Sequence, residues 1–183
     1  SGSSRGLGDV YKRQVIATGG LSDLAKESVT NISAVVKKLT GKDIKDYDLH
    51  VQFPGTHNVD GDSASITMAT AIISAFEGVP IDQNLAMTGS LSVRGEVLPI
   101  GGVSAKIEAA VKSGIERVVI PRSNLQDVLI DEKYESMVEI IAVDSLDEVL
   151  EHALVGEQEK VSLVERLAKV IDTFSATSDS TLA

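Results

Sequence analysis

Apolar residues recur at two different spacings along this chain, and stretches of the two kinds alternate. An apolar residue at every third or fourth position predicts a helix packed on a core, whereas one at every second position predicts a half-buried strand. A chain that alternates such helices and strands buries both by packing the helices against a sheet. The sequence therefore predicts the α+β class, with a mixed α/β sheet covered by helices.

The expected helices begin or end at recognisable signals. They are 21–39, ended by Gly41; 63–76, apolar or small on nearly every side; 103–113; two that begin near Ser123 and Ser145, where Gln or Glu follows three residues later; and an amphipathic 161–174, for which loose docking is an open alternative. The expected strands are 47–53, 117–120 and 138–143, with 85–93 and 96–100 forming a hairpin or a bent strand pair.

The two ends of the chain differ in composition from its middle. Gly, Ser and Arg dominate residues 1–14, which have neither an apolar core nor an amphipathic period. An expression leader or a sequencing scar is the favoured interpretation of this segment, and a short flexible arm is the alternative. We expect one domain over 15–156, a helix over 157–174, and a disordered tail over 175–183, which is too poor in apolar area to order itself.

Charge and cysteine content exclude several classes of protein. The 17 basic and 27 acidic residues give a net charge of −10, which disfavours a nucleic-acid surface and a basic contact with membranes. Cysteine is absent, which excludes disulfides, thiolate catalysis and iron–sulfur clusters and is compatible with the cytosol. No apolar run reaches the roughly 18–20 residues of a membrane span. We expect an acidic domain without a nucleic-acid partner or direct membrane contact.

Motifs for cofactors and metals are missing from the sequence. Gly41-Lys42 lacks the rest of a phosphate-binding loop, and Gly101-Gly102 is not a dinucleotide-binding fingerprint. The three histidines, His50, His57 and His152, are too dispersed to indicate a metal site, and His50 is expected on the non-core face of its strand. The chain is therefore predicted to bind no cofactor and no metal itself.

Ser63 follows a glycine-bearing turn at the start of the expected buried helix. Backbone N–H groups at a helix start are unpaired and can bind developing negative charge. A hydroxyl in this position can therefore be a nucleophile with an oxyanion hole beside it. The alternative is that Ser63 or Asp62 only caps the helix, as Ser and Asp commonly do, and this segment alone favours capping.

Lys106 lies near the edge of the apolar face of the 103–113 helix, just after the Gly101-Gly102 turn. A lysine partly removed from water has a lowered pKa, because burial disfavours its charged form. Lowering this pKa from about 10.4 to about 7–8 costs on the order of 4 kcal/mol. The alternative is a surface lysine paired with a helix neighbour, and spacing alone favours it.

Three segments, taken in order, resemble the proteolytic domain of the Lon proteases. They are Asp-Gly-Asp-Ser-Ala at 60–64, the run AMTGSLSVRGEVLPIGG at 86–102, and the lysine-bearing helix that follows. The resemblance extends from about residue 15 to about residue 154. The Asp-Ser-Ala form is similar to the archaeal, membrane-anchored branch, whereas bacterial members typically carry Pro-Ser-Ala. The resemblance implies the Lon proteolytic-domain fold and a serine endopeptidase. It favours the functional interpretation of Ser63 over helix capping, and that of Lys106 over a paired surface lysine.

The resemblance assigns roles to individual residues. In the family, the serine and the later lysine form a dyad, and these positions are Ser63 and Lys106. The implied chemistry is attack by Ser63, with neutral Lys106 as general base and with backbone N–H groups of Ser63 and its neighbours as oxyanion donors. Thr88 matches a threonine that hydrogen-bonds the lysine. The acidic residue before the serine maps to Asp60, with Asp62 as the adjacent candidate, in an orienting or gating role.

Some family features are missing or altered. His50 matches the first histidine of a pair whose second position is Gln52 here, so no role is assigned to that pair. Full-length members carry an AAA+ ATPase module that binds ATP and Mg²⁺, but these 183 residues contain no Walker motif. Family strands upstream of Val15 are also expected to be missing, so the domain is predicted to be N-terminally truncated. We expect weak cleavage of unstructured peptides and none of folded proteins.

The resemblance further implies unfolded polypeptides as substrates, a hexameric ring and a cytoplasmic location, with the full-length parent anchored to the cytoplasmic face of the membrane. The main alternative is a non-catalytic assembly or binding module, similar to the Lon-like domain of RadA-type recombination ATPases. A purely structural scaffold is a further alternative. The presence of both Ser63 and Lys106, and the acidity of the chain, favour the protease.

Overall fold

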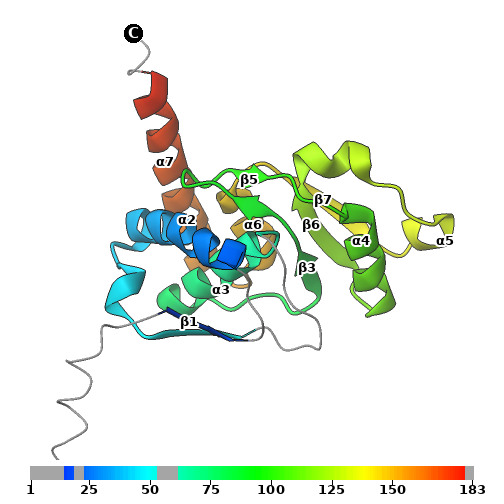
Figure 1. The fold of residues 1–183 in the computed structure, drawn as a ribbon, viewed down its shortest axis with the longest axis horizontal. Helices are drawn as coiled ribbons and strands as arrows, with labels where there is room; N and C mark the ends of the chain where they lie inside the picture. Colours follow the sequence, from blue (N-terminus) through cyan, green and yellow to red (C-terminus); the bar gives the residue numbers. More distant parts are fainter. Residues whose placement is uncertain (1–14, 19–22, 53–61, 180–183) are drawn as a thin grey trace, which may run out of the picture.

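The computed structural model describes residues 15–18, 23–52 and 62–179 and confirms the α+β class. The strands are β1 (Val15–Thr18), β2 (Leu49–Gln52), β3 (Leu85–Met87), β4 (Ser90–Leu91), β5 (Val97–Leu98), β6 (Arg117–Pro121) and β7 (Glu139–Val143). The helices are α2 (Asp23–Thr40), α3 (Ser65–Glu77), α4 (Val103–Lys112), α5 (Glu132–Glu135), α6 (Leu146–Ala153) and α7 (Gln158–Asp179), with 3₁₀ helices η1 (Ile44–Asp46) and η2 (Arg122–Asp127). Figure 1 shows their arrangement.

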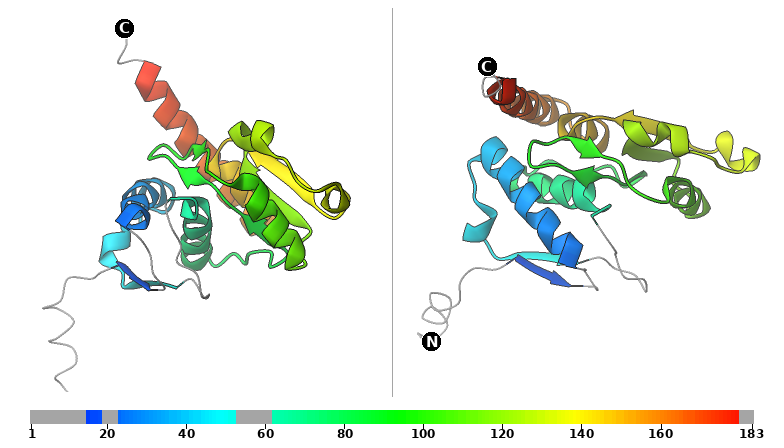
Figure 2. Two further views of the ribbon diagram at one scale, coloured as in Figure 1. Left: turned by 45° about the vertical axis from the view of Figure 1, so that its right-hand side comes forward. Right: turned by 45° about the horizontal axis from the view of Figure 1, so that its top comes forward.

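Among the described residues, the strands form three small sheets: parallel β1–β2, parallel β3–β6–β7 and antiparallel β4–β5. In the three-stranded sheet, Val118 of β6 is paired with Ala86 of β3 and with Ile140 of β7. Side chains alternate between the faces of a strand. Accordingly, Val118 packs in a small core with α4, while Val119 packs in the main core with α3 and α6. Figures 1 and 2 show α4 and α6 on opposite faces of this sheet.

The main core lies between α2, α3, α6 and α7. Helix α3 runs through its middle, which explains why the 63–76 segment is apolar or small on nearly every side. The expected start of this helix at Ser63 is wrong by two residues, because the helical backbone begins at Ser65. The other expected helices at 21–39 and 103–113 correspond to α2 and α4, within the described residues.

Three expected strands are shorter than predicted, and the one expected over 96–100 is only Val97–Leu98 in β5. Strand β2 begins at Leu49, because Tyr47 ends η1 and its ring packs on Phe76 at 5.0 Å between centroids. The expected strand 85–93 is interrupted at Thr88-Gly89, so that β3 joins the parallel sheet and β4 forms the predicted hairpin with β5. The interruption occurs because the backbone at Gly89 bonds to the start of α3 instead of to a strand.

The helix expected to begin near Ser123 is a 3₁₀ helix and not the α-helix that the sequence predicts. This segment forms the 3₁₀ helix η2, preceded by Pro121, which makes no side-chain capping bond. The side chain of Asn124 is buried and bonded to the backbone of Ile100, which ties η2 to the segment before α4. A tertiary contact thus outweighs the local helical pattern. The helix expected after Ser145 is confirmed as α6.

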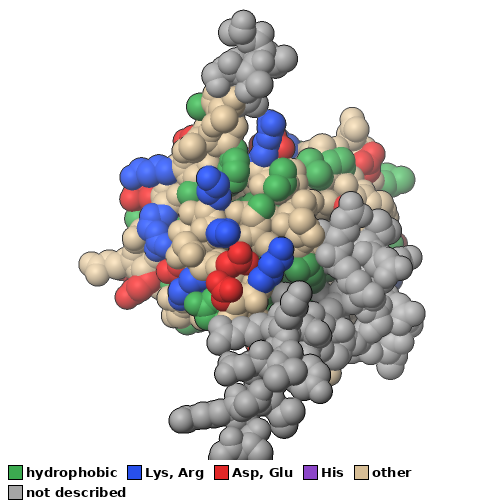
Figure 3. Space-filling model, turned by 60° about the vertical axis from the view of Figure 1, so that its left-hand side comes forward, with side chains coloured by type: hydrophobic (Ala, Val, Ile, Leu, Met, Phe, Trp, Pro, Cys, Tyr) green, Lys and Arg blue, Asp and Glu red, His purple; other side chains and the backbone are tan. Residues whose placement is uncertain are grey.

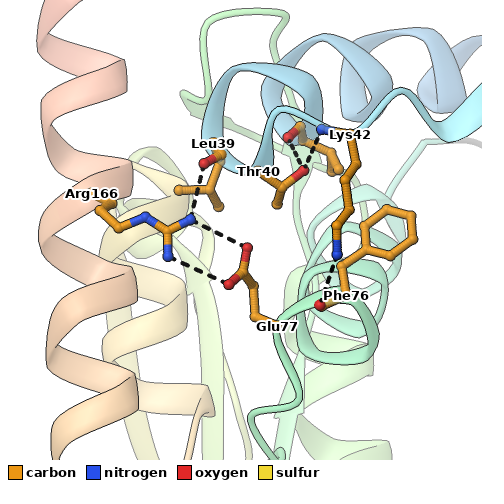
Figure 4. Close-up of polar contacts among 7 residues, drawn as sticks. Leu39, Thr40, Lys42, Phe76, Glu77 and Arg166 are labelled. Carbon is orange, nitrogen blue, oxygen red and sulfur yellow. Dashed lines mark hydrogen bonds and ion pairs between the residues drawn. The ribbon is translucent and has the colours of Figure 1, made fainter.

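Helix α7 is longer and more firmly docked than the sequence predicts. It continues to Asp179, so residues 175–179 of the expected disordered tail are helical. Leu163 and Leu167 are buried in the main core. Figure 4 shows Arg166 reaching from α7 to the Leu39 carbonyl oxygen, at 3.1 Å, and to the Glu77 carboxylate, at 3.3 and 3.4 Å. An exposed ion pair contributes about 0–1 kcal/mol, and burying one leucine about 1.5–3 kcal/mol, so apolar contacts dominate the docking.

The surface around α2 carries charges of both signs. Figure 3 views the side of the molecule where α2 and η1 lie, and shows basic and acidic side chains interspersed on it. Lys37 in the last turn of α2 pairs with Asp43 at 3.3 Å. Lysines near a helix C-terminus interact favourably with its negative end, so these charges have a local structural role. Among the described residues, no helix is both long enough and apolar enough to cross a bilayer.

Candidate active site

Ser63 lies in the turn that leads into α3, and its side chain is half-buried. The residue in the capping position is Ala64, which has no side-chain oxygen and makes no capping bond. The Asp62 carboxylate is used elsewhere, since its Oδ2 accepts a hydrogen bond from Ser90 Oγ at 2.5 Å. The capping interpretation of Ser63 and Asp62 is therefore wrong. Their side chains are free of that structural task.

The strand break at Thr88-Gly89 holds the Ser63 backbone in place. Gly89 N donates to the Ser63 carbonyl at 2.8 Å, and Thr88 Oγ1 donates to the same oxygen at 3.2 Å. Gly89 O in turn accepts from Ile66 N at 3.2 Å. A Cβ on residue 89 would lie 3.0 Å from Ile66 Cδ1 and 3.1 Å from Val97 Cγ1. A side chain at this position would push the Ile66 and Val97 side chains aside by a few tenths of an ångström, so glycine suits the close approach of the strand to the start of α3.

The backbone around Ser63 leaves donors available. The N–H groups of Ser65 and Ile66 are used by the carbonyls of Asp62 and Gly89. Within the described part of the chain, the N–H groups of Ser63 and Ala64 have no such partner. Two adjacent backbone donors at a helix start can bind an anionic oxygen. The turn therefore places a hydroxyl beside donors suited to a developing oxyanion.

Lys106 lies in the second turn of α4 and is half-buried. Burial lowers the pKa of its amine below the usual lysine value, and the carboxylate of Asp62 raises it by a smaller effect. The fold thus brings the amine within electrostatic reach of the residue directly before Ser63. No carboxylate among the described residues lies within 4.0 Å of the amine, whereas Lys112 of the same helix pairs with Glu108 at 3.8 Å. The interpretation of Lys106 as a surface lysine paired with a helix neighbour is wrong.

The other predicted residues are placed as follows. Asp60 and His57 lie outside the described residues. Thr88 is buried, and its hydroxyl donates to the Ser63 carbonyl, whereas the resemblance implied a bond to the lysine. His50 is exposed on β2, as its place in the alternation predicted. Among the described residues, no group of three or more His, Asp or Glu side chains could hold a metal ion.

Two serines near the turn were not predicted from sequence. Ser90 is buried and bonds to the Asp62 carboxylate from β4, 28 residues along the chain. Ser65 Oγ lies 2.9 Å from Ser28 Oγ of α2 and 2.5 Å from Asp62 O. The Ser65–Asp62 bond spans only three residues, but the Ser90–Asp62 and Ser65–Ser28 bonds join elements that meet only in the folded chain, so no local pattern identifies them.

A family model of the Lon protease (S16) C-terminal proteolytic domain matches residues 8–156. The chain belongs to the Lon protease family. The match begins inside residues 1–14, the segment interpreted above as a leader. It establishes the Lon proteolytic-domain family for the fold that carries the Ser63 turn and the Lys106 helix.

Relatives within the Lon family confirm the resemblance to archaeal members. The chain is 56% identical over 160 residues to an archaeal Lon protease of Methanothermobacter thermautotrophicus, which covers 87% of this chain and 25% of the relative. It is 53% identical over 158 residues to the archaeal Lon protease of Archaeoglobus fulgidus, a match that covers 86% of this chain and 25% of the relative. It is 47% identical over 133 residues to Lon protease 2 of Bacillus subtilis, a match that covers 73% of this chain and 23% of the relative. The chain thus spans about a quarter of the length of these curated relatives.

Proposed function

We propose that this chain is a serine endopeptidase domain in which Ser63 is the nucleophile and Lys106 the general base. One observation carries the proposal. Burial lowers the pKa of the Lys106 amine, and this amine is close enough to Asp62, the neighbour of Ser63, to feel its charge. A general base must be neutral to accept a proton, and burial favours the neutral amine. Membership of the Lon protease family supports the same assignment.

The mechanism follows from the roles of these groups. Neutral Lys106 takes the proton of Ser63 Oγ as that oxygen attacks a peptide carbonyl, and the N–H groups of Ser63 and Ala64 stabilise the oxyanion. Lys106 then gives the proton to the leaving amine, which departs and leaves an acyl-enzyme. Neutral Lys106 then takes a proton from a water molecule as the water oxygen attacks the ester carbonyl. The bond from this carbon to Ser63 Oγ breaks, and Lys106 returns the proton to Ser63 Oγ.

Thr88 and Asp62 have supporting roles in this proposal. The Thr88 hydroxyl donates its hydrogen bond to the Ser63 carbonyl. The lone pairs of the same oxygen stay available to accept a hydrogen bond from the Lys106 amine. Asp62 opposes the neutral amine, because a nearby carboxylate favours the charged form. We assign it a gating role, in which Asp62 sets the pH range over which Lys106 is neutral. Asp60 is proposed on family resemblance alone.

For the intact protein we propose the arrangement implied by the family. The proteolytic domain would act with an AAA+ ATPase module that uses ATP and Mg²⁺, in a hexameric ring that cleaves unfolded polypeptides. A cytoplasmic location, with the parent anchored to the cytoplasmic face of the membrane, belongs to the same proposal. The relatives are archaeal Lon proteases, which supports the protease assignment. The match covers about a quarter of their length, which leaves room for such a module.

Hydrolysis of an unstructured fluorogenic peptide tests the nucleophile. Ser63→Ala is expected to reduce turnover to background while circular dichroism shows an unchanged fold, because no other atom of that residue can attack. Ser162→Ala, an exposed serine on α7, is the matched control and should retain the wild-type rate. Equal turnover in the wild type and Ser63→Ala would contradict the proposal. A folded but inactive wild type would favour the non-catalytic binding module.

The pH dependence of the same reaction tests the role of Asp62. Asp62→Asn removes the charge that raises the pKa of Lys106 but keeps an oxygen to accept the Ser90 bond. The pKa of Lys106 should fall, so the rise of kcat/KM with pH should move to lower pH and the rate on the acidic side should increase. Glu108→Gln, on the same helix as Lys106, is the control and should leave the midpoint unchanged. An unchanged or raised midpoint in Asp62→Asn would exclude the gating role.

A further inference from the structure

Asn124 of η2 is a buried polar residue, 2% exposed, that has no part in the chemistry above. Its side-chain amide pairs with both backbone groups of one residue. Oδ1 accepts from Ile100 N at 2.9 Å, and Nδ2 donates to Ile100 O at 2.9 Å. Nδ2 also donates to Asp127 Oδ2 at 3.0 Å. Two hydrogen bonds to one residue fix its rotation as well as its position, as a neighbouring strand would.

Ile100 lies directly before the turn from which the lysine helix begins. Gly101 and Gly102 follow it, and Gly102 adopts a left-handed conformation with φ 69°. The Gly102 carbonyl accepts the first-turn bond from Lys106 N at 3.2 Å. A Cβ at either glycine would meet nothing within 4 Å, so no described atom restrains the turn at these two positions. The Asn124 bonds to Ile100 supply that restraint.

A second pair of bonds from the same region reaches the first turn of α4. Ser104 Oγ donates to Asp127 O at 3.0 Å and accepts from Leu129 N at 2.8 Å. We call the bonds of Asn124 to Ile100 and of Ser104 to Asp127 and Leu129 the η2 clamp. Farther along α4, Glu108 Oε1 accepts from Asp131 N at 3.2 Å, and the Lys112 amine lies over the Tyr134 ring. The apolar packing of α4 on β6 is not directional and does not set the helix position along its axis.

We infer that the η2 clamp, with Asn124 at its centre, positions the Lys106 amine relative to Ser63. The inference rests on the proposed function. Ser63 is held by a different element, the strand break at Thr88-Gly89, so each half of the dyad has its own hydrogen-bonded support. A displacement of about 1 Å can reduce the rate on the order of 10²-fold. Asn124 is thus a positioning residue that acts through Ile100, without touching the reacting atoms.

Asn124→Ala in the 183-residue chain tests the inference by two measurements. Steady-state peptide hydrolysis should show kcat reduced on the order of 10²-fold with KM nearly unchanged. Labelling of Lys106 with an amine-reactive ester across pH, quantified by peptide mass spectrometry, should show its titration midpoint shifted toward that of an ordinary lysine. A loosened α4 exposes the amine to water and raises its pKa. Unfolding would move the midpoint in the same direction, so labelling is compared only in samples that circular dichroism shows to be fully folded. Asn84→Ala, an exposed asparagine, is the matched control.

Removing the Asn124 amide leaves the backbone of Ile100 unpaired, and Asn124→Ala could therefore fail to fold. A second variant, at Ser104, tests the same inference without this change. Ser104→Ala should shift kcat and the Lys106 midpoint in the same directions, and Ser104→Thr, which keeps the hydroxyl, should restore both. A folded Asn124→Ala or Ser104→Ala with the wild-type Lys106 midpoint would overturn the inference. Failure of the proposed function is distinguishable, because hydrolysis would then be unaffected by Ser63→Ala, while the labelling midpoint still reports the environment of Lys106.

Discussion

Lys106→Met is expected to lower peptide hydrolysis by about 10²- to 10⁴-fold, the usual contribution of a positioned general base. Methionine is similar in length to the lysine stem and is apolar, so the half-buried site can accept it without a large change in packing. Burial lowers the pKa of Lys106, which means that folding disfavours its charged form. Replacing the amine removes this penalty at neutral pH. The thermal unfolding midpoint should therefore be unchanged or higher while activity is lost.

Two further variants separate proton transfer from charge. Lys106→Arg keeps a positive charge that cannot be removed, so it should be as inactive as Lys106→Met at every pH measured. Lys112→Met, on the same helix and paired with Glu108, should keep a rate close to that of the wild type. Substantial activity in Lys106→Arg would mean that the residue supplies charge and not a base. Activity in both Lys106 variants would remove it from the mechanism.

Leu167→Ala is expected to destabilise the domain by about 2–5 kcal/mol, the usual cost of truncating a fully buried leucine. Leu167 has no exposed surface and packs in the main core between α7 and the rest of the domain. The measurement is denaturant unfolding followed by circular dichroism, with the midpoint and slope both fitted. The expected result is a lower midpoint with a similar slope, because the same surface is exposed on unfolding.

Val161→Ala provides the matched control on the same helix. Val161 is 54% exposed, and its truncation should change the free energy of unfolding by no more than about 0.5 kcal/mol. If Leu167→Ala had an equally small effect, α7 would be loosely attached, which is the alternative that the sequence left open. The difference between the two variants therefore measures how much the docking of α7 contributes to stability.

Several elements were predictable because local patterns are sufficient for them. The run of β-branched residues in β6, and the glycines that follow α2 and α4, are local signals, and their positions agree with the structure. The ordered motifs around Ser63 and Lys106 pointed to the Lon family, which the match over residues 8–156 confirmed. The helical pattern after Ser123 misled because it carries no information on the buried contact of Asn124 with Ile100.

The contacts that were not predictable join residues far apart in the chain. Thr88 bonds to the Ser63 carbonyl across 25 residues, Ser90 to Asp62 across 28, and Asn124 to Ile100 across 24. Local periodicity was enough to indicate the class of fold. The ordered motifs indicated the family, and the resemblance to that family indicated the candidate dyad. The break in the β3 strand, the environment of Lys106 and the docking of α7 required the folded chain. Burial and hydrogen bonding between separate elements arise only when packing brings those elements together, so no window of sequence contains them.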